Sequence, residues 1–308
     1  VFQRWTLGGD VRSGWSWGGE RRSTALEMGA SFDLNNFWGG YAGGIHEFGA
    51  LLTDVLRGGP AIRANPLDVG WFGLYSDRRR SYGVRVDGNF GVEEGTDLYW
   101  LSLNTGVEMR PTDRFELSLS PGIYRLTDVW ICAVQPTCQV INPQRNDSRY
   151  LFARIDQTTV ALTARLNYTF TPDLSLQFYA QPFVSAGDYS EFKEVTDPRG
   201  QRFEDRFRTF PDAQVRPDGQ GGYALDADGD GRTDFGFRNP DFNFKELRSN
   251  AVLRWEYRPG SALFVVWSQG RTGFEPEGSF RFGRDFRRLW EADATNVLLV
   301  KLSYWLDL

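Results

Sequence analysis

The sequence predicts an all-β protein, an antiparallel transmembrane β-barrel with about twelve strands in this chain, which either close by themselves or form an arc of a larger barrel. First, apolar and polar residues alternate with a period of two along many segments, while no long segment has a helical period. Second, some alternating segments, such as 147–171, are far longer than the ~5–6 residues typical of strands in soluble sheets. Third, short and long links alternate along the chain, which is typical of bacterial outer-membrane barrels.

Composition agrees with a β protein and excludes several other classes. The 308 residues include 24 Phe, 12 Tyr, 11 Trp and 34 Gly, and aromatic residues favour strands. The mean hydropathy of −0.44 is compatible with a barrel, because only alternate residues of its strands face lipid. A helical membrane protein is excluded, because it needs runs of ~20 apolar residues that this sequence lacks. The net charge of −5 gives no reason to expect nucleic acid as a partner, and a single His excludes a His-rich metal site.

Twelve segments carry the alternation that predicts a strand. In chain order they cover residues 1–17, 23–34, 38–50, 67–77, 81–93, 97–110, 114–134, 147–171, 173–195, 242–258, 261–274 and 296–308. The apolar side chains that share one face in the clearest segments are Leu26, Met28, Ala30, Phe32 and Leu34; Tyr99, Leu101, Leu103, Val107 and Met109; Phe115, Leu117 and Leu119; Leu162, Ala164, Leu166, Tyr168 and Phe170; Leu174, Leu176, Phe178 and Ala180; Ala251, Leu253, Trp255 and Tyr257; and Leu298, Val300, Leu302, Tyr304, Leu306 and Leu308. Because successive side chains of a strand point to opposite faces, each segment has one apolar and one polar face.

The links between the strands are of two kinds. The short links are 35–36, 77–80, 111–113, 171–173 and 259–260. The long links lie near 51–66, 135–146, 196–241 and 275–295, and the last contains a short helical candidate, Asp285–Ala294. We therefore expect a single outer-membrane β-barrel domain over 1–308, with the long loops outside the cell and with the short turns and the C-terminus in the periplasm.

A soluble β-sandwich or propeller is the alternative fold. Such a fold would also alternate, but its strands are shorter and its apolar face is buried. Aromatic residues near the predicted strand ends favour the barrel, because Trp and Tyr gather at membrane interfaces. These residues are Trp5, Trp15, Trp17, Trp38, Tyr75, Tyr82, Trp255, Tyr257, Tyr304 and Trp305.

Several segments resemble one particular protein family. They are RYLFARIDQTTVALTARLNYTFTPDLSLQFYAQPFVSAGDYSEFKE (149–194), FNFKELRSNAVLRWEYRPGSALFVVWSQGR (242–271), RGGP (57–60), SDRRR (76–80) and NVLLVKLSYWLDL (296–308). Together they resemble bacterial outer-membrane proteins that carry an N-terminal module like the family 9 carbohydrate-binding modules and a large C-terminal domain of unknown function that looks like a β-barrel. The resemblance covers essentially the whole chain and implies that it is the C-terminal portion of a longer protein. It carries over no catalytic or binding residues, and Leu308 departs from the usual aromatic end of such barrels, with Trp305 three residues earlier.

The sharpest local motif is DADGDGRTD, residues 226–234. Positions 1, 3, 5, 7 and 9 of an EF-hand-like calcium loop are taken by Asp226, Asp228, Asp230, Arg232 (through its carbonyl) and Asp234. Gly231 stands at position 6, where the loop turns sharply, but position 12 is Phe237 instead of Glu, and Asp241 is the next carboxylate. The motif predicts a Ca²⁺ ion that orders the 196–241 loop, and the alternative is a solvated Asp/Gly turn.

Cys132 and Cys138 are the only cysteines of the chain. An exported protein meets an oxidising compartment, so we expect a disulfide between them in a long external loop. A free pair or a metal site is the alternative, and a metal site would lack a nearby His.

His46 is the sole histidine, so a Ser–His–acid hydrolase would have to use it. Glu47 lies beside it in the sequence but points to the opposite face of the strand, which leaves it poorly placed to orient the imidazole. We therefore expect no catalytic residue here, and a surface hydrolase is only the third functional hypothesis.

The inferred lumen face carries side chains of both charges. Its candidates are Glu27, Arg85, Asp87, Trp100, Glu108, Glu116, Arg165, Gln177, Tyr179, Gln181, Arg254, Glu256 and Lys301. Mixed charges predict internal ion pairs or a weakly charged aqueous pore. Trp100 and Tyr179 could stack on sugar rings or fill space inside the barrel. The turn at Arg78–Arg80 could contact anionic headgroups or stay solvated.

The leading hypothesis is an outer-membrane barrel in which solutes pass or bind at the surface. Carbohydrate is the favoured solute class, and only the family resemblance favours it. The alternative is a structural or assembly component whose external loops bind other surface proteins. The expected partners are outer-membrane lipid and carbohydrate or surface proteins, and Ca²⁺ is the expected cofactor.

Overall fold

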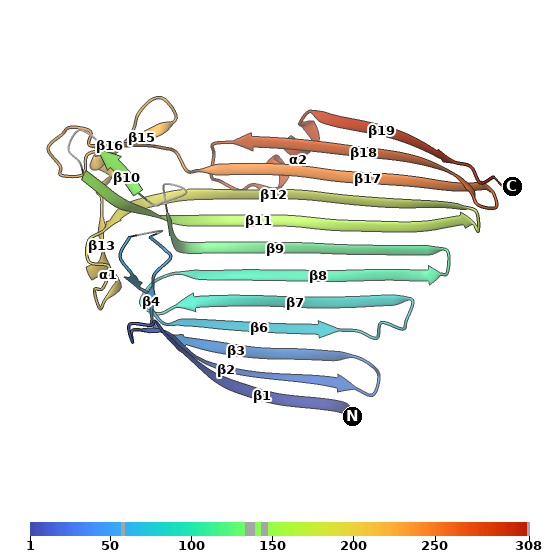
Figure 1. The fold of residues 1–308 in the computed structure, drawn as a ribbon, viewed down its shortest axis with the longest axis horizontal. Helices are drawn as coiled ribbons and strands as arrows, with labels where there is room; N and C mark the ends of the chain where they lie inside the picture. The colour runs from blue at the N-terminus through green and yellow to red at the C-terminus, as the bar shows by residue number, and fades with distance from the viewer. Residues whose placement is uncertain (57–58, 133–138, 143–146, 307–308) are drawn as a thin grey trace.

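One large antiparallel sheet dominates the computed structural model, which describes residues 1–56, 59–132, 139–142 and 147–306. Twelve strands follow one another through this sheet in chain order (Figure 1). They are β1 (Phe2–Trp15), β2 (Arg21–Leu34), β3 (Gly39–Phe48), β6 (Leu67–Tyr75), β7 (Tyr82–Glu93), β8 (Tyr99–Thr112), β9 (Phe115–Cys132), β11 (Asp147–Thr171), β12 (Leu174–Val195), β17 (Phe242–Arg258), β18 (Ser261–Glu275) and β19 (Ala294–Ser303). The twelve predicted strands are therefore all present, with ends that differ by a few residues.

The links separate the molecule into a turn end and a loop end. The short links, which join β2 to β3, β6 to β7, β8 to β9, β11 to β12 and β17 to β18, all lie at one end of the sheet together with both chain termini (Figure 1). Among the described residues, β1 and β19 each pair with one neighbour only, so the sheet is an open arc. The all-β prediction is confirmed, and the described strands form an arc without a closed barrel.

Strand register divides the side chains of the sheet into two faces. Residues directly opposite each other in an antiparallel pair share a face, and the pairs Val11↔Leu26 and Asp10↔Glu27 show the two kinds. We call them the apolar face and the polar face. Large side chains of the apolar face remain exposed to the surroundings: Trp5, Leu7, Val11, Leu26, Met28, Leu74, Val84, Phe90, Leu101, Ile123, Leu253, Trp255, Trp267, Leu298, Val300 and Leu302.

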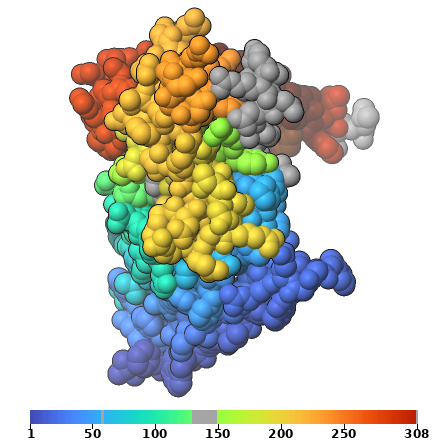
Figure 2. Space-filling view, turned by 90° about the vertical axis from the view of Figure 1, so that its left-hand side faces the viewer, coloured from blue at the N-terminus to red at the C-terminus, as the bar shows by residue number. Residues whose placement is uncertain are grey.

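Buried apolar residues gather at the loop end instead of the middle of the sheet. Leu151 and Ala153 of β11 pack with Phe192, Phe210 and Leu225 in the largest cluster. The short elements of this end are β4 (Leu51–Leu52), β5 (Ile62–Arg63), β10 (Gln139–Asn142), α1 (Phe203–Arg206), β13 (Phe207–Thr209), η1 (Asp212–Gln214), β14 (Val215–Pro217), β15 (Gly222–Leu225) and β16 (Phe235–Arg238). Figure 2 looks onto this end, where the segment 196–241, coloured yellow to orange, spreads over the front.

Two of the predicted long loops pack against each other in a unit that we call the cap, residues 49–56, 59–66 and 196–241. Leu56 of the first segment is buried in one cluster with Phe152 and the partly buried Phe207. The Arg63 N–H donates to the Pro198 carbonyl over 2.7 Å, and the buried Arg206 guanidinium donates to the Arg63 carbonyl. Segments about 140 residues apart in the sequence are thus held together by both apolar and polar contacts.

The last long link contains α2 (Phe282–Glu291), which begins and ends three residues earlier than the predicted helix. Its Leu289 is fully buried against Val184 and Leu247, so the helix covers the loop end of the apolar face over β12 and β17. The buried Asp285 carboxylate accepts the Arg281 N–H over 2.7 Å and the Arg284 Nε–H over 2.8 Å. Among the described residues, no helix is both long enough and apolar enough to cross a membrane.

Candidate functional sites on the polar face and in the cap

The register places every predicted lumen residue on the polar face. The residues are Glu27 of β2; Arg85 and Asp87 of β7; Trp100 and Glu108 of β8; Glu116 of β9; Arg165 of β11; Gln177, Tyr179 and Gln181 of β12; Arg254 and Glu256 of β17; and Lys301 of β19. They extend across the whole sheet and do not form one compact cluster. The polar face is therefore a surface with many dispersed groups.

Acids and arginines of this face pair along single strands. Residues two apart in a strand point to the same side, and Arg85 Nε lies 2.9 Å from Asp87 Oδ1 in this way. The same spacing joins Asp10 to Arg12, Glu108 to Arg110, Glu246 to Arg248 and Arg254 to Glu256. In each of these pairs an acid lies beside an arginine of its own strand, so these charges are neutralised locally.

Aromatic rings of the polar face lie against glycines of the neighbouring strand. A Cβ atom added at Gly91 would lie 2.3 Å from Trp100 Nε1, so the ring needs the space that glycine leaves. The Tyr179 hydroxyl donates to Gln181 Oε1 over 2.7 Å, and the Arg165 guanidinium lies 5.3 Å from the Tyr179 ring centre. The predicted aromatic candidates Trp100 and Tyr179 thus pack against the polar face of the sheet.

One aromatic residue departs from the predicted interfacial belt. Tyr75 lies on the polar face opposite Arg85, and its hydroxyl donates to Asp33 Oδ1 over 2.7 Å. Tyr75 of β6 thus reaches across β3 to Asp33 of β2 on the polar side of the sheet. The sequence predicted Tyr75 as an aromatic residue of the membrane interface, but the strand register places its side chain on the polar face. That prediction is therefore wrong.

A hollow of about 310 Å³ lies among the polar-face groups near the turn end. Its walls include Arg85, Glu108, Ser118, Ser120 and Arg165, which come from β7, β8, β9 and β11. Small side chains in the middle and charged side chains around them make this hollow hydrophilic. Such a surface can hydrogen-bond to hydroxyl-rich solutes through donors and acceptors of both kinds.

The acidic loop of the cap brings together part of the predicted calcium set. Carboxylate oxygens of Asp226, Asp228 and Asp234 lie within 4.8 Å of one another. Asp226 is buried and accepts the Gly231 N–H over 2.8 Å, while Gly231 has the positive φ of 86° that the turn at position 6 requires. Asp230, whose Oδ1 accepts the Arg232 N–H over 2.8 Å, is not in the group.

The later positions of the motif serve the packing of the cap. Phe237, at position 12, belongs to the largest buried cluster. The Asp241 carboxylate accepts the Tyr189 N–H over 2.8 Å, and its burial raises the pKa of the carboxyl. Asp241 is thus engaged with β12 and does not complete the group of three.

Two other predicted features have different outcomes. The disulfide between Cys132 and Cys138 stays a prediction, because Cys138 lies outside the described residues. In the turn between β6 and β7, Arg79 donates to Asp77 over 2.9 and 3.0 Å. These hydrogen bonds lower the pKa of Asp77 to about 2. Arg79 is therefore committed to its own turn, although the sequence allowed a contact with headgroups.

Asp68 is the acid that orients His46, and no sequence pattern predicted it. His46 lies directly opposite Asp68 of β6, and His46 Nδ1 is 2.8 Å from Asp68 Oδ1. The two residues are 22 positions apart, so only an alignment of the two alternating segments across the 51–66 loop could have paired them. Glu47, the neighbour in sequence, points to the other face.

A family model described as a domain of unknown function, DUF5916, matches residues 59–308. The chain belongs to this family. The matched range contains β6 to β19 and therefore most of the polar face, the acidic loop and α2. The match concerns this domain and not the carbohydrate-binding module of the predicted resemblance. No curated protein matches the chain.

Proposed function

We propose that the chain forms the wall of a bacterial outer-membrane β-barrel through which small hydrophilic solutes pass, with carbohydrates as the favoured class. The observation that carries this proposal is the contrast between the two faces of the sheet. One face exposes large apolar side chains on most of its strands, and the other carries acid–arginine pairs.

The apolar face supports the membrane part of the proposal. Soluble monomers rarely expose contiguous apolar patches beyond a few hundred Å², whereas Trp5, Leu298 and Val300 are each more than 60% exposed. Strands of ~9–11 residues are enough to cross the hydrocarbon core. With nine residues, even β6 meets that length.

The strand arrangement is compatible with barrel closure. Unpaired strand edges attract another strand, and a barrel removes such edges. An even number of antiparallel strands makes β1 and β19 run in opposite directions, and both chain termini lie at the turn end. Closure can therefore come from direct pairing of β1 with β19 or from further strands between them.

The polar face supports the choice of solute. A pore lined by fixed charges of one sign selects ions, and one lined by paired charges does so weakly. The pairs Arg85–Asp87 and Glu108–Arg110 leave donors and acceptors available to hydroxyl groups without a net field. Carbohydrate, rather than another neutral solute, is favoured by the family resemblance alone.

Liposome swelling with sugars of graded size tests the proposal. We expect uptake that slows as the sugar grows and that differs little between neutral and singly charged solutes. Glu108→Gln should shift the passage towards anions, because it leaves Arg110 without its acid, whereas Asp113→Asn in the nearby turn should not. Absence of flux together with stably co-purifying proteins would favour the alternative, a structural component whose cap binds other surface proteins.

We also propose that Ca²⁺ binds the 226–234 loop through Asp226, Asp228 and Asp234. Three carboxylates this close repel one another unless a cation screens them, and oxygen ligands are the ones that Ca²⁺ prefers. Calorimetric titration of the chain with CaCl₂ should give heat that Asp228→Asn reduces and Asp212→Asn does not. A wild-type chain that gives no heat would contradict the proposal.

A further inference from the structure

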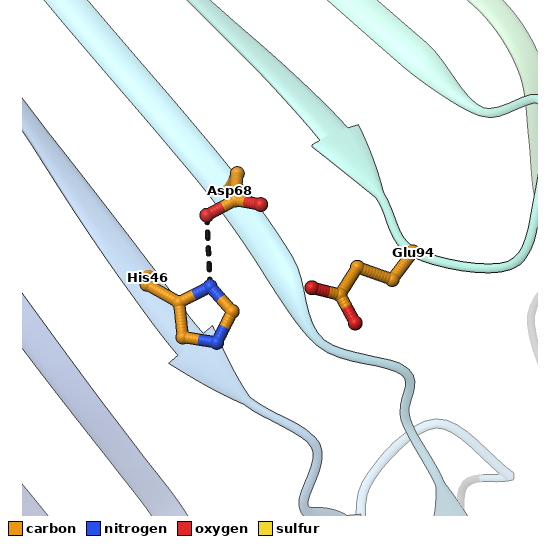
Figure 3. Close-up of side chains that lie close together, drawn as sticks. All are labelled: His46, Asp68 and Glu94. Carbon is orange, nitrogen blue, oxygen red and sulfur yellow. Dashed lines mark hydrogen bonds and ion pairs between the residues drawn. The ribbon is translucent and has the colours of Figure 1, made fainter.

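Three side chains from neighbouring strands line up on the apolar face, at the loop end of the sheet (Figure 3). His46 lies near the end of β3 and pairs directly with Asp68 near the start of β6. Asp68 in turn pairs with Val92 of β7, and Glu94 follows Val92 by two residues. Since residues two apart in an extended chain point to the same side, Glu94 joins the other two.

The three side chains converge to within the reach of one ion. One nitrogen of His46 and one carboxylate oxygen from each of Asp68 and Glu94 lie within 4.8 Å of one another. The shortest separation is the 2.8 Å between His46 Nδ1 and Asp68 Oδ1. Figure 3 shows the Glu94 carboxylate turned towards the same space as the imidazole.

Neighbouring contacts hold the three groups in place. The Phe48 ring meets the His46 ring edge-on, with centres 4.5 Å apart. The Glu94 N–H donates to the Pro66 carbonyl over 2.9 Å, which fixes the backbone of Glu94 beside the start of β6. The His46 side chain is 30% exposed and that of Asp68 is 51% exposed, so an ion can reach them from solvent.

We infer that His46, Asp68 and Glu94 form a binding site for a divalent transition metal ion, with Zn²⁺ as the ion it fits best. Imidazole and carboxylate are both zinc ligands, with bonds of about 2.0–2.2 Å. Ca²⁺ and Mg²⁺ take oxygen ligands, so the imidazole separates this site from the acidic loop of the cap. Three protein ligands leave a fourth tetrahedral position for water or an external ligand.

Binding requires only small movements. Ligand atoms around a tetrahedral zinc ion lie roughly 3.3–3.6 Å apart when the bonds have these lengths, so His46 and Asp68, now 2.8 Å apart, need to separate only slightly. Glu94 lies beyond the end of β7 and is exposed, so its flexible side chain can close the remaining distance. The bound ion would join β3, β6 and the link that follows β7 at the loop end of the sheet.

Isothermal titration of the detergent-solubilised, chelator-treated chain with ZnCl₂ tests this inference. We expect one zinc ion per chain at this site, with an affinity that His46→Ala and Glu94→Gln each lower by roughly tenfold or more. Glu47→Gln is the matched control, since it removes a neighbouring carboxylate on the other face, and it should leave the affinity unchanged. X-ray absorption of the zinc-loaded chain should report one imidazole ligand.

Other outcomes would overturn the inference. Zinc binding that persists unchanged in both His46→Ala and Glu94→Gln would place the ion elsewhere. Zinc binding that disappears in Asp228→Asn but not in Glu94→Gln would place it in the acidic loop of the cap. Because Glu94 is exposed and outside the strands, Glu94→Gln keeps the test valid even where His46→Ala prevents folding.

Discussion

Asp77 and Arg79 show at the scale of single residues how a short turn uses its charges. The Arg79 guanidinium donates twice to the Asp77 carboxylate and lies 3.1 Å from the centre of the Phe37 ring. Two links of the turn end, 35–38 and 76–81, are thereby held together. The run of three arginines suggested a contact with lipid, but one of them is used inside the protein.

This ion pair makes a specific prediction for the titration of Asp77. The Arg79 side chain is the largest cause of its lowered pKa of about 2, so Arg79→Ala should raise that pKa towards the ordinary value of about 3.9. Carbon-detected NMR of the Asp77 carboxyl across acid pH measures the change. Arg80→Ala is the control, because Arg80 Nε lies 3.7 Å from Asp77 Oδ2, beyond hydrogen-bond distance, and should have a smaller effect.

The same scale shows what a sequence does not reveal. The position of His46 in an alternating strand correctly excluded Glu47 as its partner. The residues that approach His46 are Asp68 and Glu94, and neither is marked by spacing or motif. Their proximity depends on the pairing of β3 with β6 and of β6 with β7, which the length of the intervening loops does not determine.

At the scale of elements, the link between β18 and β19 stabilises the sheet through the helix α2. Leu289 is fully buried on Val184 and Leu247, while the neighbouring Trp290 is 55% exposed. Hydrogen bonds from Arg284 and from the Arg281 backbone keep the pKa of the Asp285 carboxyl below its usual range, although burial alone would raise it. Leu289 therefore anchors the helix on the sheet, while Asp285 binds Arg281 and Arg284 at the start of the helix.

We expect Leu289→Ala to release α2 from the sheet. Removing a fully buried leucine side chain costs about 2–5 kcal/mol, and only the segment around 276–293 should lose protection. Hydrogen exchange followed by mass spectrometry measures this local change. Trp290→Ala should cost no more than about 0.5 kcal/mol, as expected for an exposed site, and equal effects of the two substitutions would contradict the packing described.

Strands were predictable from the sequence and the cap was not. A wall strand such as β11, with 25 residues, repeats its two-residue period many times, so the signal is strong. The strands β14, β15 and β16 have three or four residues each, and so short a segment has no measurable period. They exist because Leu225, Phe235 and Phe237 pack with β11. No pattern in the sequence of 196–241 predicts this contact.

At the scale of the whole molecule, the two faces of one sheet have opposite chemistry, and no second layer of the described residues covers the middle of either face. Buried clusters occur at the loop end, in the cap and beneath α2. Interstrand hydrogen bonds therefore hold the central sheet without a protein core, and its apolar face needs a surrounding that is itself apolar. In the proposed function, a lipid bilayer provides this surrounding.

Cysteine scanning of β8 in bacterial outer membranes tests this account most directly. In a chain with Cys132→Ser and Cys138→Ser, single cysteines would replace Leu101, Ser102 and Leu103. Because Ser102 lies on the polar face and the two leucines on the apolar face, a water-soluble maleimide should label the Ser102→Cys chain alone, while a lipid-soluble reagent should label the other two. Equal labelling of all three positions by the water-soluble reagent would contradict a membrane-spanning wall.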